Sequence, residues 1–438
     1  MPTPTPHRPP SQTTRAGGMF RALGHRNFRL FFAGAFLSNA GTWMQTVAQS
    51  WLVLQLTDSG TWLGVDTFIA TAPGLVLTLV GGVIADKVDR KRLLIYTQAG
   101  AGLSALALGG LVWAGAIRWE GAARRPSDVW MVLALSFVTG CCWALSGPAY
   151  QAITVDLVER EDLANAIALN SSQFQLARVA GPTLAALTIR TLGMAGCFFA
   201  NGLSYVAIVA ALGRVKFRRR SAAPPAEPAA GGKAAGVRRS MWNDLAEGFR
   251  YVRGRPRVGA VLLCSTAVCL FGAPYLVLLP LFARNVYGWE EAGLSLLMGT
   301  AGAGALVGAL GLAYLGDLRR KGLVLLGCML SAGTCITGLA SVTSPRAALP
   351  LLFATGMTMV TFFALGNTLV QQLVTDEMRG RVMSMWILTF IGTMPVGSFL
   401  SGAAADRFGP RPTLAACGLV VLAFGLAAGL LTPRLREM

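Results

Sequence analysis

Long apolar runs, separated by short polar or charged segments, dominate the pattern of residues along this chain. Each run is near or above the roughly 20 residues that a helix needs to cross the hydrocarbon core of a bilayer. The runs are too long and too uniformly apolar for barrel strands of about 9–11 residues with alternating polarity. The pattern therefore predicts an all-α polytopic membrane protein with twelve transmembrane helices, at residues 28–53, 61–84, 93–115, 129–155, 163–190, 192–212, 258–284, 291–316, 322–342, 347–374, 380–405 and 412–431.

Composition supports a chain that is solvated by lipid. Of its 438 residues, 54% are hydrophobic and 13% are charged, about half of the roughly 25% charged residues in soluble domains. The 52 glycines fit close packing between transmembrane helices. All eight cysteines fall in apolar runs, so we expect small buried hydrophobic residues and no metal site. The sequence carries no Walker motif, and we expect no cofactor.

The distribution of positive charge predicts the orientation of the chain. Most of the 38 lysines and arginines fall in alternate loops, beginning with the N-terminal tail. The positive-inside rule then places both termini in the cytoplasm. The net charge of +18 also matches anionic lipid headgroups, and nucleic acid binding is not expected because no basic run contains interleaved aromatic residues. The predicted organisation is a disordered cytoplasmic tail (1–27), a six-helix bundle (28–212), a cytoplasmic linker with an amphipathic helix (213–257), a second six-helix bundle (258–431) and a cytoplasmic tail (432–438).

An internal repeat relates the two predicted bundles. The segment LVEREDLANA (157–166) aligns with LVTDEMRGRV (373–382). The charged segment GGVIADKVDRKRLL (81–94) has a weaker counterpart, LGDLRRKG (315–322). Two six-helix halves joined by a cytoplasmic linker are an architecture of secondary transporters.

These segments carry a resemblance to a known family. The charged loop at 81–94, its counterpart at 315–322 and the RVAGP sequence in the fifth run resemble motifs of the major facilitator superfamily. The segments 41–64 and 163–182 are similar to the exporter branch of that superfamily, which includes an enterobactin exporter and macrolide efflux pumps. The resemblance covers the chain after residue 20 and implies the superfamily fold of two six-helix pseudo-repeats, in the cytoplasmic (inner) membrane of a prokaryote.

The resemblance also implies a gate at the cytoplasmic end. In the superfamily, the acid that matches Asp86 caps the helix that begins near Arg379, and the base that matches Arg90 pairs with an acid at the position of Asp156. Because a helix N-terminus carries about half a positive charge, we expect these contacts to hold the cytoplasmic side shut in the outward-facing state. The alternative is that the loop marks topology alone. The gate candidates are Asp86, Arg90, Lys91, Asp156, Asp317 and Arg379.

Polar residues follow one face of the first predicted span. At 100° per residue they lie in a narrow arc, and such a stripe is costly against lipid. The fourth span carries a similar file, and in the superfamily spans one, four, seven and ten line the central cavity. Hydrogen bonding between helices is the alternative. The cavity candidates are Asn39, Trp43, Thr46, Gln49, Trp143, Ser146, Tyr150, Phe271, Tyr275 and Asn367.

Two charges lie inside predicted spans. A proton-driven exporter needs a carboxyl group that exchanges protons within the membrane domain, and Asp66 is the candidate. The alternative is a static Asp66 that is bonded to Trp62 or Thr67, or paired with Arg178. Arg178 is the intramembrane charge of the fifth span, with either a structural role or a role in substrate or proton coupling. Asp406 lies only at the outer end of its span.

The sequence therefore predicts a transporter and not an enzyme. We expect a proton-coupled antiporter that exports bulky amphipathic small molecules, of the drug, macrolide or siderophore type, by alternating access. A lipid or lysolipid flippase of the same fold is the alternative. A membrane enzyme or sensor is disfavoured because both histidines lie in the predicted tail and no catalytic cluster occurs. The expected partners are the small-molecule substrate, protons and membrane lipids, and the chain is expected to be a monomer.

Overall fold

The computed structural model describes residues 20–77, 88–119, 121, 124–215, 241–316, 318–432 and 436, and every regular element in this part of the chain is helical. The predicted gate residues Asp86 and Asp317 lie outside the described residues. The α-helices are α1 (Arg26–Thr57), α2 (Gly60–Thr71), α4 (Arg90–Trp113), α5 (Val129–Leu157), α6 (Leu163–Arg214), α7 (Met241–Arg253), α8 (Pro256–Ala267), α9 (Tyr275–Leu281), α10 (Glu291–Leu315), α11 (Lys321–Ser341), α12 (Pro345–Leu373), α13 (Asp376–Leu388), α14 (Met394–Phe408) and α15 (Pro410–Leu431). Short 3₁₀ segments are η1 (Arg21–Gly24), η3 (Pro126–Asp128) and η4 (Arg160–Asp162), and short π-helical segments are η5 (Val268–Gly272), η6 (Phe282–Val286) and η7 (Thr389–Thr393).

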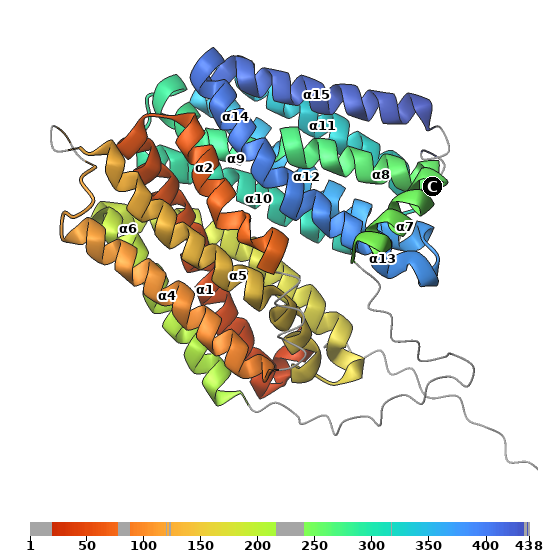
Figure 1. Ribbon diagram of the computed structural model, residues 1–438, viewed down its shortest axis with the longest axis horizontal. Helices are drawn as coiled ribbons and strands as arrows, with labels where there is room; N and C mark the ends of the chain where they lie inside the picture. The colour runs from red at the N-terminus through yellow and green to blue at the C-terminus, as the bar shows by residue number, and fades with distance from the viewer. Residues whose placement is uncertain are drawn as a thin grey trace, which may run out of the picture.

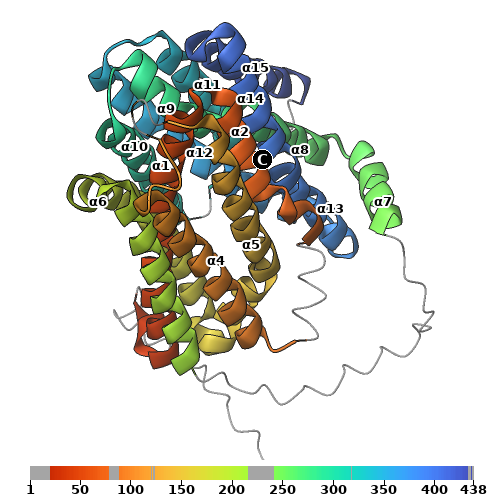
Figure 2. The same cartoon turned by 60° about the vertical axis from the view of Figure 1, so that its left-hand side comes forward.

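The helices gather into two groups. Helices α1, α2, α4, α5 and α6 lie on one side of the molecule, and α8 to α15 lie on the other (Figure 1). The groups meet where α6 packs on α10 and where α2 packs on α14. In the turned view, α7 stands apart from the main body beside α13 (Figure 2), which it contacts.

Helix length and composition establish a polytopic membrane protein. Nine stretches among the described residues are long and apolar enough to cross a membrane. One of them, Arg160–Arg214, has 55 residues and is broken at Gly193, where φ is 70°, a value that glycine adopts at little cost. Helix α1 has 32 residues and extends about 48 Å at 1.5 Å per residue. The predicted all-helical polytopic class is thus confirmed.

Local sequence explains many of the helix bounds. Proline begins α8, α12 and α15, a position where its missing N–H breaks no helical bond. Gly409, with φ of 90°, separates α14 from α15. The π-helical segments interrupt the seventh and eleventh predicted spans, and such segments are frequent at functional sites.

The two ends of the bundle can be told apart by charge. The predicted cytoplasmic end holds η1, η4, the start of α4 and the helix α7, and the predicted outer end holds the α1–α2 turn, η6 and the end of α14. At the first end, Arg21 and His25 approach the Asp162 carboxylate at 2.8 and 2.7 Å, and Ala22 is buried. The prediction of disorder up to residue 27 is therefore wrong for residues 20–27, because these contacts attach the segment to the bundle.

Candidate functional site

A cavity of about 640 Å³ lies between the two groups of helices, in the half of the molecule next to the predicted cytoplasmic end. Its polar wall belongs to the first group, and its apolar wall of small residues belongs to the second. The polar lining residues are Ser38, Asn39, Gln98, Ser146, Tyr150, Gln151, Asn170, Ser171, Gln173 and Gln175. The second group contributes Ala309, Leu312, Ala313, Val360 and Ala364.

The cavity includes some of the residues that the sequence predicts and omits others. Asn39, Trp143, Ser146 and Tyr150 line it. The candidates outside its lining are Trp43, Thr46, Gln49, Phe271, Tyr275 and Asn367. Sequence reasoning missed the polar residues of α4 and α6, although the close spacing of Asn170, Gln173 and Gln175 along the fifth span was a visible signal.

Buried amides and hydroxyls on the cavity wall leave hydrogen-bonding capacity for a ligand. Asn39 donates to Gln173 at 3.4 Å, and Gln173 donates to Asn170 at 3.3 Å. The buried hydroxyl of Tyr150 makes no hydrogen bond of accepted geometry. Because buried polar groups are normally satisfied, this hydroxyl is a natural contact for a bound molecule or water.

Asp66 lies outside this cavity, nearer the predicted outer end, in a polar cluster. The Gln49 amide donates to both carboxylate oxygens at 3.0 and 2.9 Å, and the Ser136 hydroxyl lies 2.6 Å from one of them. Asp66 is 9% exposed, and no cation pairs with it in the described part of the chain. Asp66 is therefore bonded to neither Trp62 nor Thr67 nor Arg178, and the static alternatives that named these partners are wrong. The Thr67 hydroxyl donates instead to the Leu63 carbonyl of its own helix.

The cluster continues as a chain of hydrogen bonds across four helices. Asn201 of α6 donates to Gln45 at 2.6 Å, and Gln45 donates to Gln49 at 3.1 Å. The Gln49 amide then reaches Asp66 of α2 and Ser136 of α5. The orientation of Gln49 is therefore fixed by its neighbours, with its donor group directed toward the carboxylate.

The same cluster can accommodate either protonation state of Asp66. Ser136 has one hydroxyl proton but two acceptors, the Asp66 carboxylate at 2.6 Å and the Val132 carbonyl at 3.0 Å. If Asp66 is ionised, Ser136 donates to it; if Asp66 is protonated, Asp66 donates to Ser136, and Ser136 turns to the carbonyl. Gain or loss of one proton thus requires only a hydroxyl rotation.

Arg178 lies near the middle of the helix bundle, where α6 meets α1 and α10. Its guanidinium is 5.2 Å from the centroid of the Trp43 ring, a cation–π contact. A Cβ added at Gly302 of α10 would lie 2.6 Å from the Arg178 carbonyl oxygen, so the backbones touch here. An unpaired guanidinium at the centre of a membrane helix costs at least about 2.5–3.5 kcal/mol, which the aromatic contact offsets in part.

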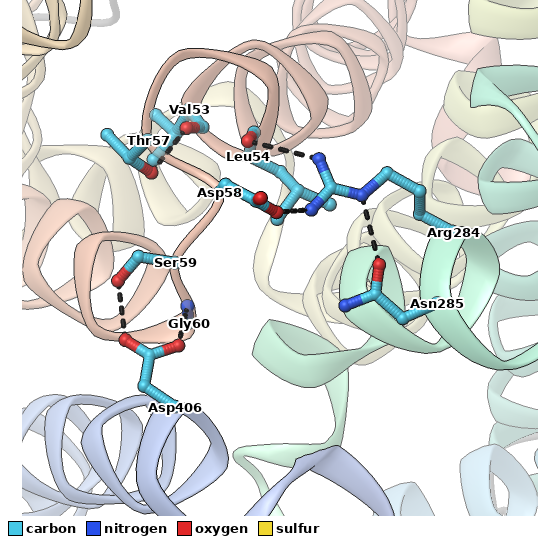
Figure 3. Close-up of polar contacts among 9 residues, drawn as sticks. All are labelled: Val53, Leu54, Thr57, Asp58, Ser59, Gly60, Arg284, Asn285 and Asp406. Carbon is cyan, nitrogen blue, oxygen red and sulfur yellow. Dashed lines mark hydrogen bonds and ion pairs between the residues drawn. The ribbon is translucent and has the colours of Figure 1, made fainter.

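Polar contacts between the two groups close the predicted outer end (Figure 3). The Asp406 carboxylate accepts hydrogen bonds from the Gly60 and Thr61 backbone N–H groups at 2.5 and 2.9 Å, and from the Ser59 hydroxyl. An acid of α14 therefore caps the N-terminus of α2 from the opposite group. Beside it, Arg284 of η6 forms an ion pair with Asp58, the residue that ends α1.

Close backbone packing accompanies these polar contacts. A Cβ added at Gly64 of α2 would lie 2.5 Å from the Ser398 carbonyl oxygen of α14, and one added at Gly402 would collide with the Gly60 carbonyl. Small residues allow helices to approach in this way. The two groups are therefore in close contact at the predicted outer end, and the cavity lies toward the opposite end.

The described gate residues, Arg90, Lys91, Asp156 and Arg379, lie at the opposite end, and the contacts given for them here are within their own groups. Arg90 is 3.7 Å from Asp156, so the structure brings this predicted pair together. Lys91 donates to the carbonyls of Gly213 and Val215 at 2.9 Å, where α6 ends. Arg379 pairs at 2.6 Å with Asp376, one turn earlier on α13.

Chemistry that depends on a metal finds no support in the described residues. No group of three His, Cys, Asp or Glu side chains there could hold a metal ion. The eight cysteines are free, and half of them are buried. The site is thus a binding cavity with a separate buried carboxyl group and a separate, partly buried cation.

Comparison with known proteins identifies relatives along nearly the whole chain. The model of the transmembrane secretion effector family matches residues 17–438. A staphyloferrin A transporter of Staphylococcus aureus is 23% identical, over 89% of this chain and 92% of its own. A macrolide efflux protein of Streptococcus pyogenes is 23% identical, over 91% of this chain and 94% of its own. An enterobactin exporter of Escherichia coli is 25% identical, over 94% and 93%.

Solved structures share the fold at low identity. A nucleoside transporter matches with a TM-score of 0.68 and 11% identity, over 92% of this chain and 99% of its own. A bacterial homologue of the lysosomal transporter Spinster, in an inward-facing conformation, matches with a TM-score of 0.66 and 14% identity, over 94% and 98%. These likenesses bear on the fold alone.

Proposed function

Because the chain belongs to the transmembrane secretion effector family, a family of transporters and not of enzymes, we propose that it is a proton-coupled antiporter that exports bulky amphipathic small molecules. It crosses the membrane twelve times, with both termini in the cytoplasm. The count rests on the nine spans among the described residues, on the second crossing within α6 after Gly193, and on α1 and α2, whose polar residues lower their hydropathy.

The observation that carries the proposal is the asymmetry between the two ends of the molecule. The cavity lies in the half near the predicted cytoplasmic end, while Asp406, Arg284 and the glycine contacts close the other end. A transporter that works by alternating access binds at the interface of its two halves and rocks them about that site. The present arrangement fits loading from the cytoplasm.

The two walls of the cavity support an amphipathic substrate. Amides and hydroxyls of α1, α5 and α6 provide directional hydrogen bonds, and alanine and valine side chains of α10 and α12 provide an apolar surface. A volume of about 640 Å³ lies within the roughly 300–1,000 Å³ of drug-sized sites. The names of the relatives, which include siderophore and macrolide transporters, agree with molecules of this size and character.

Proton coupling is assigned to Asp66. The carboxyl group is buried, lacks a cationic partner among the described residues, and sits in a cluster that accommodates its neutral and ionised forms. A proton that enters from outside would neutralise Asp66 after the substrate leaves, and its release to the cytoplasm would reset the cycle. The coupling is then carried by the first group of helices.

Transport into vesicles tests this proposal. Purified protein is reconstituted into liposomes, and accumulation of erythromycin, enterobactin and fluorescein is followed after a pH gradient is imposed. Protein-free liposomes and liposomes with a collapsed gradient are the controls. We expect gradient-dependent accumulation of at least one probe; if none exceeds the protein-free control, the proposed function is wrong.

A further inference from the structure

Arg178 is a partly buried cation within a membrane helix, and no anion pairs with it among the described residues. It lies on α6 at the level of Trp43, near the middle of the 32-residue helix α1. The buried carboxyl group of Asp66 is bonded to Gln49 and Ser136 instead. No ion pair to Arg178 occurs among the described residues, which is unusual for an arginine within a membrane domain.

Two aromatic side chains approach the Arg178 guanidinium, Trp43 of α1 and Tyr275 of α9. The guanidinium carbon of Arg178 lies over the Trp43 ring, 5.2 Å from its centroid, and a cation–π contact of this kind uses none of the five N–H donors. Tyr275 of the opposite group is close enough to interact electrostatically with Arg178. Its side chain is 2% exposed, yet its hydroxyl makes no hydrogen bond of accepted geometry. A planar fork beside an unsatisfied hydroxyl is the donor set that binds an oxyanion.

The position of Arg178 connects this donor set to the cavity. Phe174 and Gln175, which line the cavity, precede Arg178 by one helical turn on α6, and residues three or four apart share a helix face. The Trp43 ring packs edge-on against Phe174, with the ring centroids 6.3 Å apart. Phe174 of the cavity wall thus contacts the ring of Trp43, which in turn contacts the Arg178 guanidinium.

The charge of the site indicates which ligand completes it. The residues that line the cavity include no carboxylate and no cation, and Arg178 follows the lining residue Phe174 by one helical turn on α6. Four elements, α1, α6, α9 and α10, meet around it, from both groups of helices. An anion bound here would contact both groups at once and would therefore respond to their relative motion.

We propose that Arg178 and Tyr275 form an anion subsite, and that the exported class is amphipathic molecules with an oxyanion, such as a carboxylate, held by the Arg178 guanidinium. The apolar body of such a molecule lies in the cavity against α10 and α12, and its acidic group extends past the Trp43–Phe174 ring pair toward Arg178. This inference deepens the proposed export function and rests on it for the direction of transport. Binding of the anion itself is independent of proton coupling.

A matched pair of probes tests the subsite. Fluorescein carries a carboxylate, which its methyl ester replaces with a neutral ester group, while both probes keep the same ionisable xanthene oxygens. Binding of each to purified full-length protein is measured by fluorescence anisotropy. We expect wild type to prefer fluorescein over the ester by about tenfold or more, the effect of one charge-assisted contact. Arg178→Gln should reduce this preference to within about twofold while it leaves the affinity for the ester unchanged.

Three controls keep the result interpretable. Arg190→Gln changes an exposed arginine on the same helix and should keep the full preference. Arg178→Lys keeps the charge but not the planar fork, and it should retain part of the preference for fluorescein. Tyr275→Phe removes only the unsatisfied hydroxyl and should weaken binding of fluorescein but not of the ester. The proposal is overturned if wild type does not distinguish the two probes, or if Arg178→Gln retains the preference.

Two further measurements show whether a failure lies in the subsite or in the export function, and which class of molecule supplies the anion. If liposomes accumulate a probe but show no preference for the carboxylate, the subsite is wrong and the export function stands. If the preference in binding is present but no probe is transported, the export function is wrong and the subsite stands. Lysophosphatidylglycerol is added as a competitor: displacement of fluorescein assigns the oxyanion to a lipid headgroup, and retention assigns it to a free organic acid, both of which require Arg178.

Discussion

The Asp406 carboxylate at the end of α14 accepts a hydrogen bond from the Gly60 backbone N–H, 2.5 Å away, at the start of α2. The two residues belong to opposite groups of helices and lie far apart in the sequence. The contact is therefore available only while the predicted outer end is closed. Together with the ion pair between Arg284 and Asp58, it makes the outer closure a set of polar bonds that water can replace.

Loss of the Asp406 charge should open the outer end more often. Asp406→Asn keeps the size of the side chain but weakens the cap on α2, and loss of a cap costs about 0.5–2 kcal/mol. The measurement is the rate at which an impermeant maleimide labels Ser398→Cys, a buried position on α14, in a protein without its native cysteines. We expect faster labelling. Asp376→Asn, at the other end of the second group, is the control and should leave the rate unchanged.

Two glycines should behave differently because they face different partners. A Cβ at Gly402 would meet the Gly60 carbonyl across the two groups, whereas one at Gly304 would meet the Phe353 carbonyl within the second group. Overpacking costs about 1–3 kcal/mol. Gly304→Ala should therefore lower the melting temperature, while Gly402→Ala should mainly raise the labelling of Ser398→Cys. Equal effects of both substitutions on melting and on labelling would contradict this assignment.

Asp66→Asn should uncouple transport from the proton gradient. The amide still accepts from Gln49 but cannot release a proton, so binding and downhill exchange persist and accumulation driven by pH alone is lost. Accumulation and exchange are measured on the same liposomes. Asp128→Asn is the matched control, a second buried acid whose carboxylate accepts from the Arg118 backbone N–H at 2.9 Å, and it should remain coupled. Concentrative transport by Asp66→Asn would remove Asp66 from the mechanism.

Adjacent residues of α10 allow a direct test of the cavity. Ala309 lines the cavity, and Leu310 is 50% exposed on the outside of the helix. Ala309→Trp fills space that the substrate needs and should weaken fluorescein binding about tenfold or more, while Leu310→Trp should leave it within about twofold. Anisotropy titrations of both variants provide the comparison. Equal affinities would mean that the substrate binds elsewhere.

The helices were more predictable from the sequence than the site. The apolar run at 291–316 ends at charged segments on both sides, and α10 (Glu291–Leu315) follows it to within one residue. Hydropathy records the length of a helix but not its rotation in the bundle, so it does not place Gln98 in the cavity wall, and Gln173 stands out only through its polar neighbours on the same span. The role of Asp406 was hidden for a related reason. Its partner Gly60 becomes a neighbour only when two distant turns meet at the same end of the fold.

The Asp66 cluster shows a further limit of sequence reasoning. The acid itself stood out because charges are rare in membrane spans. Its partners Gln49 and Ser136 come from two other helices, and Gln49 is equally consistent with a cavity residue when only the face of its helix is known. The three-dimensional packing decides between these two roles, since it turns the Gln49 amide toward Asp66.

The most direct test of alternating access measures both ends of the molecule at once. Spin labels replace the exposed residues Ser127 and Phe408 at the predicted outer end, and Arg160 and Ser384 at the predicted cytoplasmic end, in a protein without its eight native cysteines. Pulsed electron paramagnetic resonance measures the distance between the two spin labels at each end, with and without saturating fluorescein. The account predicts that the ligand lengthens the outer distance and shortens the cytoplasmic one in the same population. Distances that both stay fixed, or that change in the same direction, would contradict it.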